Sequence, residues 1–304
     1  MSCQQSTNWV EQTIEKDFDQ HSLDGKSYKK IKILIKFTSD LKIIYSYNGK
    51  ILRVVECHDA FEKQELFNNI NQIHNLQWQG QYSENKKKDG RWNAFWNQQL
   101  LKNFGGYYTQ GKKSGLWKDL FPNYSKQLQI FEIGEYYNGL RIGGWKYFLE
   151  NQKIGGGFYN KNGQKQGKWI DLDEGFQDSK KVIFCGEYDL KSMKVGQWDI
   201  MYSNAYENGN GKYKQMQKFE NIRIICIYIL KMYSGGGSYD QAGNQKKIGK
   251  WVELDEKFRD KNQVIYNGEY NMNGIKVGRW DIMYDRKVNG IYKQMQKFLN
   301  IRII

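Results

Sequence analysis

One pattern recurs along most of the chain: Gly-x-Tyr, a short segment, and then Gly-x-Trp. It occurs seven times without a substitution at its four marked positions. A repeat of this kind constrains the fold strongly, because every copy has to form the same supersecondary unit and pack on its neighbours. The paired glycines that begin the two halves are Gly80 and Gly90, Gly106 and Gly115, Gly134 and Gly143, Gly157 and Gly167, Gly186 and Gly196, Gly237 and Gly249, and Gly268 and Gly278.

The spacing within each copy is typical of a β-hairpin. The two marked residues of each half are two apart, so their side chains share one face of a strand. Six to nine residues separate the halves while the flanks stay constant, as expected where the strand ladder fixes the register and the loop absorbs insertions. Simple antiparallel pairing puts Trp145 opposite Gly134 and Tyr136 opposite Gly143, so each ring covers a glycine and has a structural role. Residues suited to turns with positive φ occur at Asn138-Gly139, Asn162-Gly163 and Asn273-Gly274.

A longer period overlies the hairpins. Residues 155–225 closely match residues 235–304, and each copy of this unit holds two hairpins of different type. The first type continues after its Trp into Leu-Asp-Glu-x-Phe, and the second into Asp-Ile-Met-Tyr. Such an internal duplication favours a modular array over a unique active site.

Composition agrees with a fold that large rings hold together. Aromatic residues are 15% of the 304, so we expect order despite a mean hydropathy of −0.82. The net charge is +14. We favour lysines spread over a solvated sheet face as its explanation; attraction to phospholipid, nucleic acid or an acidic protein is the alternative.

The hairpins resemble MORN repeats, in the variant form in which Trp closes each unit. The resemblance covers roughly residues 75–304 and extends to a large group of predicted ciliate repeat proteins. It implies an elongated antiparallel β-meander with roles in scaffolding, cytoskeletal attachment and acidic-lipid binding. The segments that carry it are NLQWQGQY (75–82), IGGGFY (154–159), GKWIDL (167–172) and GRWDIMY (278–284).

Residues 1–75 lack the repeat and are expected to form a small α/β region before the array of residues 76–304. Residues 29–37 and 42–57 read as strands, with a tight turn at Asn48-Gly49. We expect one amphipathic helix that begins near Asp59 and Glu62, packs on the first hairpins and seals the open end of their sheet. The apolar face of this helix would consist of Leu66, Phe67, Ile70 and Ile73.

No residues in the sequence indicate a catalytic, cofactor or metal site. His21, His58 and His74 lie outside the repeats, and neither they nor Cys3, Cys57, Cys185 and Cys226 show metal-ligand spacing. The triple glycines that begin at Gly155 and Gly235 lack the remainder of a phosphate loop and fit bulged strand entry. The acidic segments 171–174 and 253–256 lack the ligand order of a calcium loop, and we interpret them as solvated loop charge that marks a docking point.

We therefore expect a cytoplasmic, non-enzymatic repeat scaffold that binds a protein partner and associates with the cytoskeleton or cortex. The cysteines are expected to be reduced, the start of the chain shows no secretory signal, and the apolar segment 224–230 is too short to span a bilayer and reads as a buried strand. Peripheral binding to acidic phospholipid is the alternative. Nucleic acid is disfavoured because rings in the packing register cannot also stack on bases. An unrecognised enzyme is the least favoured reading.

Overall fold

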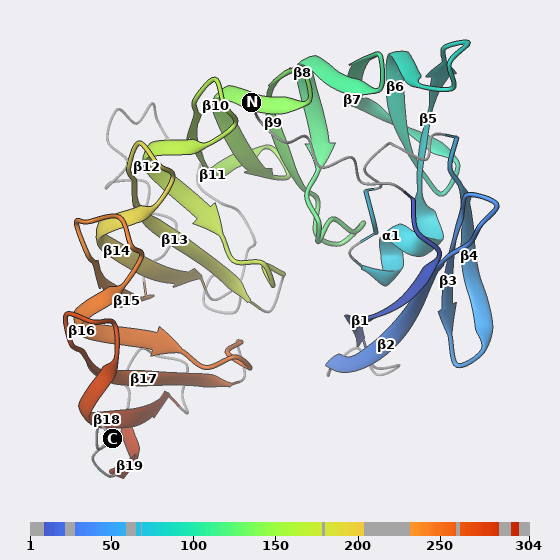
Figure 1. The fold of residues 1–304 in the computed structure, drawn as a ribbon. Helices are drawn as coiled ribbons and strands as arrows, with labels where there is room; N and C mark the ends of the chain where they lie inside the picture. The colour runs from blue at the N-terminus through green and yellow to red at the C-terminus, as the bar shows by residue number, and fades with distance from the viewer. Residues whose placement is uncertain are drawn as a thin grey trace. The chain divides into compact units, whose positions relative to one another are not determined.

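In the part of the chain that the structure describes, a computed structural model shows antiparallel sheets and one short helix (Figure 1). The chain divides into two compact units, Met1–Leu140 and Arg141–Ile304. The first contains the N-terminal region together with the first repeats. The structure describes residues 9–21, 28–58, 65–67, 69–177, 180–203, 232–259, 262–285 and 293–297.

The first unit begins with a four-stranded antiparallel sheet in sequence order. The strands predicted at 29–37 and 42–57 are present. Asn48 and Gly49 have φ of 47° and 75°, as a tight hairpin turn of type I′ requires. The strands are β1 (Gln12–His21), β2 (Tyr28–Phe37), β3 (Lys42–Tyr47) and β4 (Lys50–Glu56).

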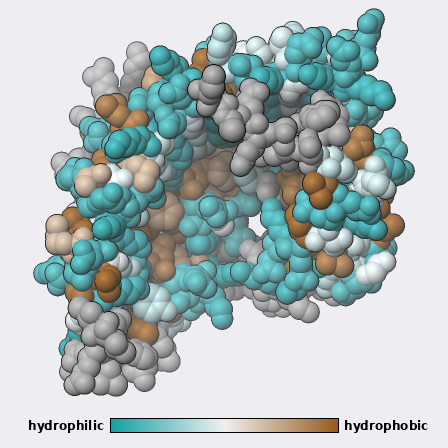
Figure 2. Space-filling view, viewed as in Figure 1, coloured by the Kyte–Doolittle hydropathy of each residue, from teal (hydrophilic) through white to brown (hydrophobic). Residues whose placement is uncertain are grey.

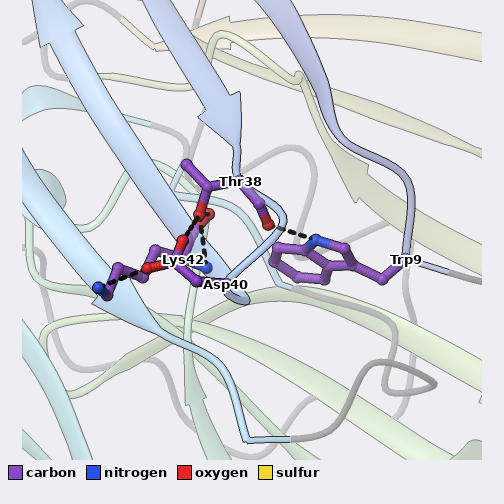
Figure 3. Close-up of polar contacts among 4 residues, drawn as sticks. All are labelled: Trp9, Thr38, Asp40 and Lys42. Atoms are coloured by element: carbon purple, nitrogen blue, oxygen red, sulfur yellow. Dashed lines mark hydrogen bonds and ion pairs between the residues drawn. The ribbon is translucent and has the colours of Figure 1, made fainter.

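Strand β1 is not evident from the sequence, because only Ile14 and Phe18 are apolar among its ten residues. It forms because all ten residues pair with β2, and this pairing places Phe18 in the core, 2% exposed. The tight turn between β2 and β3 is fixed by side chains (Figure 3). Trp9 Nε1 donates to the carbonyl of Thr38, and the Thr38 hydroxyl donates to Asp40, which also pairs with Lys42.

The helix is shorter than predicted. Helix α1 spans Ile70–Asn75, and the Asn69 side chain caps it by accepting from the backbone N–H of Gln72. The predicted start at Asp59 and Glu62 lies outside the described residues. The four expected apolar positions do pack on one core with β1 to β3, but two of them, Leu66 and Phe67, precede the helix.

Helix α1 attaches the four-stranded sheet to the loop between β8 and β9. Arg53 donates to the carbonyl of Ile73, and the side chain of Gln72 donates to the carbonyls of Phe121 and Pro122. Strand β5 remains at the end of the strand order of its sheet. These hydrogen bonds attach the helix to a repeat loop, and none of them joins the helix to the outer edge of β5.

The repeats form an antiparallel meander in which strand order follows sequence order, as predicted. The first unit contains β5 (Leu76–Tyr82), β6 (Lys88–Trp96), β7 (Gln99–Thr109), β8 (Lys112–Leu120) and β9 (Ile130–Tyr137). The second contains β10 (Leu140–Leu149), β11 (Gln152–Tyr159), β12 (Lys165–Leu172), β13 (Lys181–Tyr188), β14 (Lys194–Ser203), β15 (Met232–Tyr239), β16 (Lys247–Leu254), β17 (Gln263–Tyr270), β18 (Lys276–Asp285) and β19 (Lys293–Lys297). The strand predicted at 224–230 lies outside the described residues.

Each hairpin whose register is resolved contains a bulge that simple pairing does not predict. In β11–β12, Gly156 pairs with Ile170 but Phe158 pairs with Gln166, so one residue faces three. The same two-residue shift occurs in β5–β6, β7–β8, β13–β14, β15–β16 and β17–β18. The glycine of every Gly-x-Trp has φ between 61° and 67°, the left-handed backbone of a glycine bulge. The fixed glycine is explained by this conformation.

The bulge corrects the predicted pairing of Tyr with glycine. Tyr159 faces Lys165 within its hairpin, not Gly167. The tyrosines instead face the Gly-x-Trp glycine of the preceding hairpin, as Tyr188 faces Gly167. At the bulge the second strand of the hairpin has two extra residues, so the residue opposite Tyr is shifted by two positions.

The prediction that each Trp covers a glycine is confirmed in six hairpins. A Cβ added to the Gly-x-Tyr glycine would fall 2.2–2.5 Å from an indole atom of the same hairpin. The glycines concerned are Gly80, Gly106, Gly157, Gly186, Gly237 and Gly268. Each indole therefore fills the space that the absent side chain leaves.

Within each unit, Tyr and Trp rings alternate along the repeat sheet in edge-to-face contacts. The ring centroids are 4.8–6.4 Å apart. Such a contact contributes about 0.5 to 1.5 kcal/mol beyond burial. The seven repeat tryptophans are at most 5% exposed, so they form the core of the array.

Candidate functional site

A basic residue precedes the glycine of every Gly-x-Trp by two positions. The bulge places its cationic group over the Trp ring of its own hairpin, 4.1–4.9 Å from the ring centroid. A cation over an aromatic face is attracted by the ring quadrupole. We call these residues the basic row: Lys88, Lys113, Arg141, Lys165, Lys194, Lys247 and Lys276. The sequence does contain a signal for this row, because the pattern Lys/Arg-x-Gly-x-Trp is present in all seven copies. The pattern was not recognised as a site, because the bulge that places the cation over the ring was not predicted.

In alternate hairpins a carboxylate neutralises the basic row. In the first unit, Asp119 lies two residues after Trp117 and accepts from Lys113 at 3.0 Å and from the Tyr136 hydroxyl at 3.2 Å. Glu65 also pairs with Lys113, at 3.0 Å. Burial opposes the charged form of Lys113, but the carboxylates of Asp119 and Glu65 raise its pKa well above the ordinary value.

The second unit repeats this arrangement with Asp171. Its carboxylate accepts from Lys165 at 2.5 Å and from the Tyr188 hydroxyl at 2.7 Å. Burial raises the pKa of Tyr188, and the neighbouring Asp171 raises it further. Lys165, Asp171 and Tyr188 thus form a closed polar group beside the aromatic stack.

Glu253 takes the corresponding position in β16 and reaches one partner more. It accepts from Lys247, from the Tyr270 hydroxyl at 2.7 Å and from Lys276 of the following hairpin at 2.9 Å. Burial opposes its charged form, but hydrogen bonds from Lys247, Lys276 and Tyr270 lower the pKa of Glu253.

The interpretation of the acidic segments as solvated loop charge is therefore wrong for their leading residues. Asp171 lies in β12 and is 9% exposed, and Glu253 lies in β16. Farther along, Asp173 pairs with Lys180 at 2.8 Å and Asp255 accepts from the Tyr266 hydroxyl at 2.6 Å. Asp171 and Glu253 lie within strands because β12 and β16 continue three residues beyond Trp169 and Trp251.

Lys194 differs from the neutralised lysines. The residue two after its Trp is Ile200, and no hydrogen bond or ion pair joins Lys194 to another residue that the structure describes. Its ammonium lies among the rings of Phe184, Trp198 and Tyr239, with centroids at 5.4, 4.3 and 5.8 Å. Burial lowers its pKa. The nearby Asp171 carboxylate opposes this shift, and the neighbouring Lys165 and Lys247 add to it.

The hairpin tips also alternate in the second unit. The tip between β13 and β14 exposes Leu190 to 81%, and the tip between β17 and β18 exposes Met272 to 73% and Ile275 to 49%. The tips at 160–164 and 240–246 carry polar residues. Neighbouring tips are in contact, since the Gln245 side chain donates to Met193 Sδ at 3.2 Å.

Figure 2 shows that most of the visible surface is hydrophilic, with hydrophobic residues in separate groups. The tips between β13 and β14 and between β17 and β18 carry exposed apolar side chains. They lie in the same two hairpins as Lys194 and Lys276.

The histidines considered in the sequence are not brought together. His21 ends β1, His74 lies in the last turn of α1, and His58 stacks on Tyr82 with centroids 4.2 Å apart. Among the described residues there is no group of three or more His, Cys, Asp or Glu side chains that could hold a metal ion. Cys57 is half-buried and Cys185 is buried, while Cys3 and Cys226 lie outside the described part of the chain.

The triple glycines lie inside β11 and β15, where strands approach each other closely. Gly156 and Gly236 have φ of 123° and 111°, and a Cβ at either would fall 2.0 Å from a Trp carbonyl oxygen. They are structural, as the bulged-strand interpretation held. In the part of the chain that the structure describes, no helix is long and apolar enough to cross a membrane.

Comparison of the chain with protein-family models and with curated proteins finds no match.

Proposed function

We propose that the chain is a non-enzymatic, MORN-like repeat scaffold that binds a protein partner through its hairpin tips and basic row. The observation that carries this proposal is that the repeat residues have different structural roles. Trp and Tyr rings and bulge glycines hold the sheet, whereas Leu190 and Met272 expose apolar surface and Lys194 forms no ion pair with another described residue. Exposed apolar groups beside uncompensated charge are typical of interaction surfaces.

A protein partner is favoured over nucleic acid by the burial of the rings. Stacking on bases requires exposed aromatic faces, and the repeat tryptophans are at most 5% exposed. Catalysis has little support in the polar groups, because Asp119, Asp171 and Glu253 are each saturated by Lys and Tyr. We place the scaffold in the cytoplasm, at the cytoskeleton or cortex.

Proximity labelling in the native cell tests the proposal. The full chain would be compared with a variant in which Leu190, Met272 and Ile275 are replaced by Ser. These side chains are exposed, so the variant should fold normally. We expect a defined set of proteins to be labelled by the original chain and lost from the variant. An identical labelled set for both chains would contradict binding through the tips.

Peripheral binding to acidic phospholipid is the second candidate. Exposed Leu190 and Met272 beside lysines are also what a protein at a membrane surface presents. Sedimentation with phosphatidylserine vesicles at low and high salt tests this function, because attraction to the surface is screened within a Debye length. Absence of binding at low salt removes it.

A further inference from the structure

We propose that the basic row of the second unit binds an acidic peptide segment, with Lys194 as its principal anchor and Lys276 as the next. This inference rests on the proposed function as a protein-binding scaffold and names the chemistry of its partner. The site consists of Lys165, Lys194, Lys247 and Lys276, which occupy equivalent positions on β12, β14, β16 and β18.

The chain itself shows which group suits these lysines. Lys113, Lys165 and Lys247 each bind a carboxylate of the same sheet. At Lys194 the equivalent position holds Ile200, so the internal carboxylate is missing. A carboxylate from outside would supply the partner that this sheet provides elsewhere.

One methylene group accounts for the difference between Lys194 and Lys276. Each follows a hairpin with an acid two residues after Trp, namely Asp171 before Lys194 and Glu253 before Lys276. The longer Glu253 reaches forward to Lys276 at 2.9 Å while it holds Lys247. The shorter Asp171 holds Lys165, and no ion pair joins it to Lys194 in the described structure.

The four lysines carry more charge than their partners neutralise. Against four ammonium groups there are two carboxylates, Asp171 and Glu253, which leaves a formal charge of +2. One excess charge is at Lys194 and the other is shared where Lys247 and Lys276 bind one acid. The paired lysines remain accessible: the side chains of Lys165, Lys247 and Lys276 are 25%, 33% and 41% exposed. An ammonium has three donors, so a second carboxylate can be bound.

The spacing of the row specifies the spacing of the ligand. Successive lysines are two strands apart, which corresponds to about 9.5 Å in a sheet. Lys194 lies within electrostatic range of both Lys165 and Lys247, and also of Asp171, which forms its ion pair with Lys165. A polyproline II segment has three residues per turn and rises about 9.3 Å per turn. A segment with a carboxylate at every third position therefore matches the row.

The apolar tips supply the second half of the recognition. Leu190 belongs to the hairpin of Lys194, and Met272 belongs to the hairpin of Lys276. A partner whose acidic positions contact the lysines would place intervening apolar residues against these tips. A lipid headgroup would supply phosphate without that periodicity, so the two sources can be separated.

The test measures fluorescence anisotropy of a labelled peptide of repeated Glu-Pro-Pro, titrated with the full chain. Pro favours the polyproline II conformation, so Glu recurs at each turn. A peptide of equal composition with its Glu residues contiguous is the spacing control. We expect the periodic peptide to bind more tightly, by about threefold or more, because only it places a carboxylate at each lysine.

Three substitutions test whether Lys194 is the anchor. Lys194→Gln should weaken binding about tenfold, whereas Lys191→Gln, which removes the same charge from the exposed tip, should weaken it less than about threefold. Asp171→Glu leaves the net charge unchanged and reproduces Glu253. It should also weaken binding severalfold, because the longer acid reaches Lys194. Thermal unfolding of each variant establishes that the fold is retained.

Three outcomes overturn the proposal: equal effects of Lys194→Gln and Lys191→Gln, unchanged binding by Asp171→Glu, or equal binding of the two peptides. Binding to phosphatidylserine vesicles that Lys194→Gln abolishes, with no peptide binding, would assign the row to lipid. If proximity labelling depends on the tips but not on Lys194, the scaffold function stands and the acidic ligand is wrong.

Discussion

The hairpins β7–β8 and β13–β14 share one framework and differ in their charge. Both contain the bulge, a Trp over glycine, and a lysine over that Trp. In the first, Lys113 is buried with Asp119 and Glu65. In the second, Lys194 has rings around it and Ile200 in place of the acid. The comparison shows that the sheet depends on the rings and glycines, while the counterion at the basic row is free to vary.

The indole also differs between the two kinds of hairpin. Trp117 donates its ring N–H to the carbonyl of Tyr107 at 3.0 Å. The ring nitrogens of Trp198 and Trp280 are buried without an acceptor among the described residues. An unpaired buried donor costs about 1 to 3 kcal/mol. The hairpins β13–β14 and β17–β18 therefore each contain a buried indole N–H that lacks a described acceptor.

The largest expected effect tests whether the framework is shared. Trp117→Ala and Trp198→Ala should each lower the free energy of unfolding by about 3 to 5 kcal/mol, since each ring is at most 2% exposed. Phe158→Ala, at a ring 52% exposed, is the control and should change it by less than about 1 kcal/mol. Denaturant titration followed by tryptophan fluorescence gives the values. A small effect at only one of the two hairpins would break the comparison.

The next effect separates the two lysines. Lys113→Met leaves the buried carboxylate of Asp119 without its cation and should cost about 3 kcal/mol. Lys194→Met leaves no carboxylate unpaired and should cost less than about 1 kcal/mol. The same unfolding titration measures both. Equal losses would mean that Lys194 is held by a partner as Lys113 is.

Two glycines of one hairpin should respond differently to the same added methyl group. Gly157→Ala pushes a Cβ to 2.2 Å from the Trp169 ring and should cost about 3 kcal/mol through overpacking. Gly167→Ala meets no atom within 4 Å but has φ of 65°, so strain alone should cost about 1 kcal/mol. Gly167→Asn should recover part of that loss, because Asn tolerates the left-handed region. No recovery would mean that the bulge requires more than a permitted φ.

The smallest expected effect is the pH dependence of the ion pairs of Glu253. Glu253 pairs with both Lys247 and Lys276, whereas Asp171 pairs with Lys165. Glu253 has a folded-state pKa below its ordinary 4.5, so its stabilisation is present above about pH 4.5 and is lost as pH falls through the folded pKa. Glu253→Gln should unfold at lower temperature than the original chain at pH 7, and the difference should narrow below pH 4.5. Scanning calorimetry from pH 7 to 3 measures it. A constant difference would show that Glu253 acts through packing and not through charge.

The meander and the contact of Trp with glycine could be predicted because both follow from the spacing of Gly, Tyr and Trp in the repeat. Residues two apart share a strand face, and an indole fits only where a side chain is absent. The bulge could not be predicted by counting, because pairing arithmetic assumes one residue opposite one. The clue was the glycine of Gly-x-Trp, which a covering ring alone does not explain, since nothing lies within 4 Å of a Cβ at Gly167.

The candidate site was only partly visible in the sequence. Lysines were read as a solvated face because their charge is spread along the chain, but the bulge gathers one from each hairpin over the rings. Asp171 looked like loop charge because it adjoins Asp173 and Glu174, and its burial depends on how far β12 continues past Trp169. Leu66 and Phe67 were predicted to lie in the helix, but they reach the same core without helical geometry.

The last strand of each hairpin pairs with the first strand of the next, and we call this pairing the seam. The seam determines how such an array can change in length. Trp198 of β14 faces Gly237 of β15, as Trp169 faces Gly186, although residues 204–231 intervene in the chain only at the first of these seams. The same pairing thus forms at seams with different lengths of chain between the two strands. Any hairpin that ends in Trp can accept any that begins with glycine, so copies can be gained, lost or exchanged as interchangeable parts.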